Sequence, residues 1–63
     1  MNKNDIVNVI LAKLQEIEAI TDPVMKHYAT AAAYADAKYL AARNGFRNEN
    51  FESIWHKAYD QFT

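Results

Sequence analysis

Apolar residues recur at helical spacing near both ends of the chain. Apolar positions three and four residues apart fall on one side of a helix, so such a pattern predicts an amphipathic helix. Within residues 4–20 the apolar positions are Ile6, Val7, Ile10, Leu11, Leu14 and Ile17. Within residues 49–62 they are Phe51, Ile54, Trp55, Ala58, Tyr59 and Phe62. We expect both segments to be helices that bury these stripes.

The middle segment, residues 22–43, carries apolar residues on two opposite faces. The first face, which we assign to the core, consists of Val24, Tyr28, Ala31, Ala32, Ala35, Tyr39 and Ala42. The second face carries a row of alanines four residues apart with a leucine beside it, namely Ala29, Ala33, Ala37, Ala41 and Leu40. An ordinary surface helix keeps one polar face. This helix is therefore short of polar covering, because only Lys26 and Thr30 interrupt the second face and the other charges lie along the margins between the two faces.

The alanine row predicts a second packing surface. Residues spaced by four form the ridge that fits into the groove of a neighbouring helix, and small side chains let two backbones come close. We expect this row, with Leu40 and Tyr34, to contact a second copy of the chain or a protein partner. Two alternatives stay open: alanine is a strong helix former that tolerates solvent, and the two outer helices could cover both faces within one chain. For Tyr34, ordinary packing is the alternative.

Signals for helix starts and stops support these boundaries. Asn2 to Asn4 can cap the first helix, and Thr21-Asp22-Pro23 begins the second, since proline at the first helical position leaves no amide unpaired. Asn44-Gly45 ends it, because glycine adopts the left-handed conformation of a helix terminus without steric cost. Asn48 or Asn50 then caps the third helix. The apolar spacing continues across the proline, so one long kinked helix is the alternative to two helices joined by a corner.

Together these elements predict an all-α fold, a small three-helix domain with a long alanine-rich central helix that associates with itself. The 63 residues suffice for one domain and contain no cysteine, which leaves self-association as the available reinforcement. A hydrophobic fraction of 51% argues against disorder, and a net charge of −1 gives no bulk attraction for nucleic acid or anionic lipid. No signal peptide or membrane span is recognisable, so we expect a cytoplasmic protein.

No arrangement of residues predicts catalysis. The chain has one glycine and no nucleophile beside a base. Glu52, His56 and Asp60 are four residues apart on one side of the last helix and could approach one cation, but a solvated polar face explains them equally. His27 has no partner at a catalytic spacing. We expect a non-enzymatic protein without a cofactor or a metal.

We therefore interpret the chain as a small protein that binds a protein partner, as a regulator, inhibitor or assembly factor, and that forms a homodimer through residues 22–43. One alternative is a nucleic-acid-associated helical protein that uses a basic spot of Arg43, Arg47 and Lys57. Another is a structural subunit of a larger complex. Short cytosolic chains of this kind are often accessory proteins, some of them phage-encoded, which is a prior from size alone.

Overall fold

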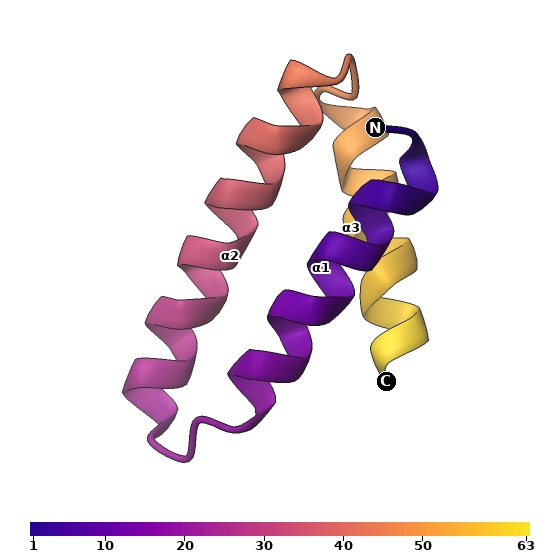
Figure 1. Ribbon diagram of the computed structural model, residues 1–63. Helices are drawn as coiled ribbons and strands as arrows, with labels where there is room; N and C mark the ends of the chain where they lie inside the picture. The colour runs from indigo at the N-terminus through magenta and orange to yellow at the C-terminus, as the bar shows by residue number, and fades with distance from the viewer.

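The computed structural model describes residues 1–63 as three α-helices (Figure 1). The helices are α1 (Lys3–Glu18), α2 (Pro23–Arg43) and α3 (Glu49–Phe62), and there is no strand. They form an elongated bundle of 34 × 19 × 17 Å. The prediction of an all-α, three-helix fold is confirmed, and its boundaries are confirmed within two residues.

The starts of α1 and α2 follow the predicted capping chemistry. The Asn2 side chain accepts a hydrogen bond from the Asp5 amide at 2.9 Å, and the Asp5 carboxylate accepts one from the Asn2 amide at 3.0 Å. These reciprocal bonds make a capping box, which satisfies two amides that would otherwise lack partners. At α2, Asp22 accepts from the Val24 amide at 2.9 Å, and Pro23 takes the first helical position. The turn before Asp22 separates α1 from α2, so the alternative of one kinked helix is wrong.

The end of α2 is fixed by Gly45, whose φ of +87° lies in the left-handed region. The Gly45 amide donates to the Ala42 carbonyl and the Phe46 amide donates to the Ala41 carbonyl at 2.9 Å, which is the Schellman pattern. Phe46 then packs against the core. Asn48 precedes α3 as predicted, but its side chain makes no capping bond, because the residue takes a φ of +54°.

The central element in space is α1, not α2. Helix α1 packs along both other helices, whereas α2 and α3 approach each other much less (Figure 1). At about 100° per residue the apolar stripe of α1 covers an arc of about 140°, which is wide enough to contact two neighbours. Its contribution to the core is Ile6, Val7, Ile10 and Leu14. Helix α3 contributes Phe51, Ile54, Trp55 and Ala58. Four residues of each predicted stripe are thus buried in the core, whereas Tyr59, also expected there, is 46% exposed.

Helix α2 turns its alanine row toward α1. Ala37 and Ala41 are fully buried and Ala33 is 6% exposed, whereas Tyr28 and Tyr39 are each 66% exposed. The assignment of the tyrosine face to the core was therefore wrong. Alanine side chains let the α2 backbone approach α1 closely, while the tyrosines would hold the two helices apart. Of the alternative in which the outer helices cover both faces, the structure shows one half: the alanine row is covered within the chain, and the opposite face is not.

None of the three helices combines the length and the apolar character that a membrane crossing requires.

The orientation of α2 is testable with a matched pair of substitutions. Ala37→Leu should lower the free energy of unfolding by about 1–3 kcal/mol, because the added carbons overpack a closed contact with α1. Ala12→Leu, at an exposed position of α1 away from the core, should change it by less than about 0.5 kcal/mol. Urea denaturation followed by circular dichroism measures both. Equal costs for the two variants would contradict the orientation described here.

The left-handed turn after α2 gives a second prediction. Gly45→Ala should destabilise the protein by about 1–2 kcal/mol, because a Cβ atom is disfavoured at positive φ. The site itself is open, with nothing within 4 Å of the added carbon, so the cost is one of backbone conformation alone. Gly45→Asn should cost clearly less, since asparagine tolerates this region. Thermal unfolding of the two variants tests the claim, and a loss of stability that follows side-chain size would refute it.

Candidate protein-interaction surface on α2

One side of α2 is apolar along the helix and is exposed from Val24 to Tyr39. We call it the outer face, and it consists of Val24, Tyr28, Ala31, Ala32, Ala35, Tyr39 and Ala42. Val24 is 61% exposed, and both tyrosines are 66% exposed. At about 100° per residue these positions fall within an arc of about 100°, on the side of α2 opposite the buried alanines. No charged residue interrupts this arc.

The outer face is unusual for the surface of a small domain. Single exposed apolar residues are normal, but a continuous exposed stripe that includes large aromatics is typical of a contact site. Tyrosine is enriched at interfaces because it brings a large contact area with little side-chain entropy to lose. Met25 extends the stripe at one edge and is 59% exposed. The stripe is therefore the best candidate for a functional surface on this chain.

The residues that the sequence pointed to as a contact site lie elsewhere. Ala33, Ala37 and Ala41 are buried inside the chain, and Ala29 and Leu40 are partly buried. The three buried alanines present almost no surface to a partner, whereas Ala29 and Leu40 keep part of theirs. The sequence pattern predicted two apolar faces on this helix; the structure packs the alanine face within the chain and exposes the face that was assigned to the core.

Tyr34, also predicted as a contact residue, connects α2 to α3 instead. Its ring meets Phe51 and Trp55 edge to face, with centroids 5.2 and 5.1 Å away. Its hydroxyl donates a hydrogen bond to the Glu52 carboxylate. That bond raises the pKa of Tyr34 above its usual value, and partial burial and the Glu52 charge act in the same direction. Tyr34 thus follows the ordinary-packing alternative.

The charged residues beside the outer face make contacts of their own. The Lys38 ammonium lies 5.9 Å from the centre of the Tyr34 ring, and the Arg43 guanidinium lies 5.8 Å from that of Tyr39. Asp36 on the other margin approaches Lys13 of α1 at 4.0 Å. Such exposed pairs contribute little to stability. They do border the apolar stripe with polar groups, which is the usual anatomy of an interface rim.

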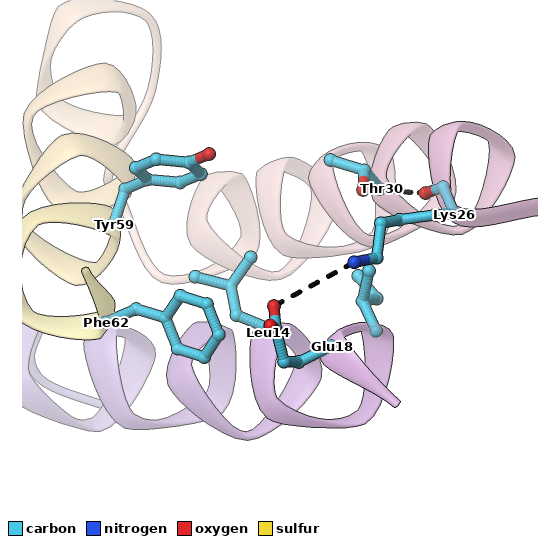
Figure 2. Close-up of a pocket in the computed structure, with 7 residues that line it drawn as sticks. Leu14, Glu18, Lys26, Thr30, Tyr59 and Phe62 are labelled. Atoms are coloured by element: carbon cyan, nitrogen blue, oxygen red, sulfur yellow. Dashed lines mark hydrogen bonds and ion pairs between the residues drawn. The ribbon is translucent and has the colours of Figure 1, made fainter. Parts of the chain in front are cut away.

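A groove lies between the end of α3 and the ends of α1 and α2 that the turn joins. Its volume is about 180 Å³, and it is lined by Leu14, Ile17, Glu18, Lys26, Thr30, Tyr59 and Phe62. Figure 2 shows the Phe62 ring beside Leu14 at one end and the Lys26 and Glu18 pair, 4.0 Å apart, at the other. The groove thus has an apolar end and an end with one exposed ion pair, and its lining does not resemble a catalytic site.

A second groove lies between α1 and α2. It measures about 240 Å³ and is lined by Lys13, Glu16, Ile17, Ala29, Ala32, Ala33 and Asp36. It runs beside the outer face at Ala32, so the apolar stripe has a shallow depression along one border.

The structure does not bring the residues considered for a metal site or for catalysis together into one site. No group of three histidine or carboxylate side chains is placed to hold a metal ion, and Glu52 is engaged by Tyr34. His56 and Asp60 are exposed on α3. His27 lies edge-on to the Tyr28 ring at 6.0 Å, away from any nucleophile.

The basic residues considered for nucleic acid are all exposed. Arg43 ends α2, and Arg47 donates from its Nε to the Ala42 carbonyl at 3.5 Å. Lys57 lies about 12 Å along α3 from the start of that helix. Glu49 and Glu52 occupy the first turn between them. Two acidic residues therefore lie along the chain between Arg47 and Lys57, so the three basic residues do not form a continuous basic patch.

Comparisons with known protein families, with curated proteins and with solved structures find no match for this chain.

The contact between Tyr34 and Glu52 gives a prediction with a pH dependence. Tyr34→Phe should lower the free energy of unfolding at pH 7 by about 1–2 kcal/mol, the lower part of the range for a hydrogen bond to a charged group, because the site is only partly buried. The folded state keeps the Tyr34 proton at a raised pKa, so this contribution is complete below about pH 10 and is lost as the pH rises further.

Denaturant unfolding of the parent chain and of Tyr34→Phe at pH 7 to 11 measures the difference. The parent's advantage should shrink above about pH 10, where the unfolded tyrosine loses its proton. An advantage that stays constant or grows there would refute the assigned hydrogen bond.

Proposed function

We propose that this chain is a non-enzymatic protein-binding module whose contact surface is the outer face of α2. The observation that carries the proposal is the exposure of Val24, Tyr28 and Tyr39 on one uncharged stripe, directly opposite the side of the helix that is already packed. In helix-in-groove recognition, apolar side chains three and four residues apart on one side of a helix enter an apolar groove of the partner. The fitting partner is therefore an apolar helix or helix pair, on another protein or on a second copy.

The shape of the molecule also supports binding in place of catalysis. The bundle holds α2 by its alanine row, so the outer face is carried on a rigid element and needs no rearrangement to meet a partner. A preformed surface of this kind loses little entropy on association. The polar groups with defined partners, such as Tyr34 and Glu52, act in holding α2 to α3. In this proposal the chain acts as a regulator, inhibitor or assembly factor by occupying a partner's apolar surface.

The proposal is tested by placing charge on the outer face. Tyr28→Glu combined with Tyr39→Glu should reduce association at least tenfold, because each interface position would then bury an unpaired carboxylate. Both positions are exposed, so circular dichroism should report an unchanged fold. Gln15→Glu with Gln61→Glu, at exposed sites on α1 and α3, is the matched control for added negative charge.

Two measurements are needed for these variants. Sedimentation velocity over a concentration series reports self-association. Affinity capture from the host, followed by reconstitution with each purified captured protein, reports association with other proteins. The proposal is overturned if neither measurement finds an association that the outer-face variant weakens and the control variant keeps.

A further inference from the structure

The Asn44-Gly45 pair at the end of α2 carries the chemistry of a covalent modification. Asparagine is one of the thermolabile residues of proteins, because the main-chain nitrogen that follows it can attack its side-chain amide. A side chain on the following residue hinders this attack, and Gly45 has none. Asn44 is the only asparagine of this chain that a glycine follows. Asn44 is partly exposed and Gly45 fully so, and solvent therefore reaches both residues.

In the folded chain, hydrogen bonds hold both reacting groups apart. The Asn44 Nδ2 donates to the Leu40 carbonyl at 2.9 Å, and the Met1 amino group, which lies beside this turn (Figure 1), donates to Oδ1 at 2.9 Å. The Gly45 nitrogen donates to the Ala42 carbonyl at 3.2 Å. The ψ of Asn44 is 13°, so the Gly45 nitrogen nearly eclipses the main-chain nitrogen of Asn44 and points away from Cβ and Cγ. The native turn is thus closed to the reaction.

We propose that Asn44 is a modification site whose reaction depends on the opening of this turn. Helix ends open locally at a lower free energy than the core does. When the end of α2 opens, rotation about the ψ of Asn44 brings the Gly45 nitrogen to Cγ. The nitrogen gives its proton to hydroxide and forms a bond to Cγ, the bond from Cγ to Nδ2 breaks, and ammonia leaves with a proton from solvent. The product is a five-membered succinimide ring.

Water then opens the ring at either of its two carbonyl carbons. If the bond between nitrogen and Cγ breaks, the main chain is restored and residue 44 becomes aspartate. If the bond between nitrogen and the main-chain carbonyl carbon breaks, residue 44 becomes isoaspartate, whose main chain runs through Cβ and Cγ and is one carbon longer. Both products carry a carboxylate in place of the amide. The reaction as a whole consumes water and releases ammonia, so it needs no enzyme or cofactor.

Either product weakens the end of α2. Aspartate has no amide to donate to the Leu40 carbonyl, and its negative charge lies where the helix dipole is also negative. The Met1 amino group offsets part of that charge. Isoaspartate lengthens the main chain between the α2 carbonyls and the Gly45 and Phe46 amides that bond to them, so the Schellman pattern loses its geometry. Phe46 packs against the core directly after this turn, so isoaspartate is the more damaging product.

The dependence on folding is measured by incubating the chain in mildly alkaline guanidinium chloride and in native buffer with sodium chloride at the same concentration. Peptide mass spectrometry follows the exchange of the amide for a carboxylate. Position 44 should react at least about tenfold faster in the denaturant, because the turn that separates the reacting atoms is open there. Asn48 and Asn50, each followed by a residue with a side chain, are internal controls that should react much more slowly. Equal rates in the two buffers, or no reaction at position 44 in the denaturant, would overturn the proposal.

The effect on stability is measured on the separated products. Ion exchange resolves them from the parent chain by their added carboxylate, and protein isoaspartyl methyltransferase marks the isoaspartate form. The urea midpoint of both products should lie below that of the parent, and the isoaspartate form should lie below Asn44→Asp, whose main chain is unchanged. Asn44→Gln is the matched control, because its longer side chain forms no five-membered ring and should stay unmodified in the denaturant. An isoaspartate form with the midpoint of the parent would overturn the assigned effect.

Discussion

The close packing of the α2 alanine row against α1 is the contact that determines the rest of this structure. Ala37 and Ala41 are fully buried there, which is possible only because their side chains are small enough for two backbones to come together. Once that side of α2 is closed, the opposite side must face outward. The exposure of Tyr28 and Tyr39 is thus a direct consequence of where the alanines pack.

Helix α1 can hold both neighbours because its branched aliphatic side chains cover a wide arc. It contributes Ile6 and Ile10, both fully buried, to a core that also takes Phe51 and Ile54 from α3. Helix α3 therefore depends on α1 more than on α2, and Tyr34 with Glu52 supplies the polar link between α2 and α3. Because α3 is shorter than α2, part of α2 extends beyond it and is covered by α1 alone.

This division has an energetic consequence for α2. The helix is the longest in the chain, yet its fully or nearly buried residues are three alanines, which remove little apolar surface from water. A domain of this size buries only about 60% of the surface of its unfolded chain. Association across the outer face would add the burial that α2 lacks, and any partner that binds only the folded chain raises its stability by mass action. Stability and binding would then depend on the same surface.

The sequence by itself determined the helices, the caps of α1 and α2 and most of the core residues of α1 and α3, because periodicity, capping residues and Gly45 are local signals. It also identified both apolar faces of α2. It did not determine which face packs, because periodicity measures only where apolar residues lie around a helix. The tertiary structure decided that point through the distance between backbones: α1 closes on alanine, and tyrosine cannot fit there. The same contact decided that Tyr34 packs inside and that α1, not α2, is the central helix.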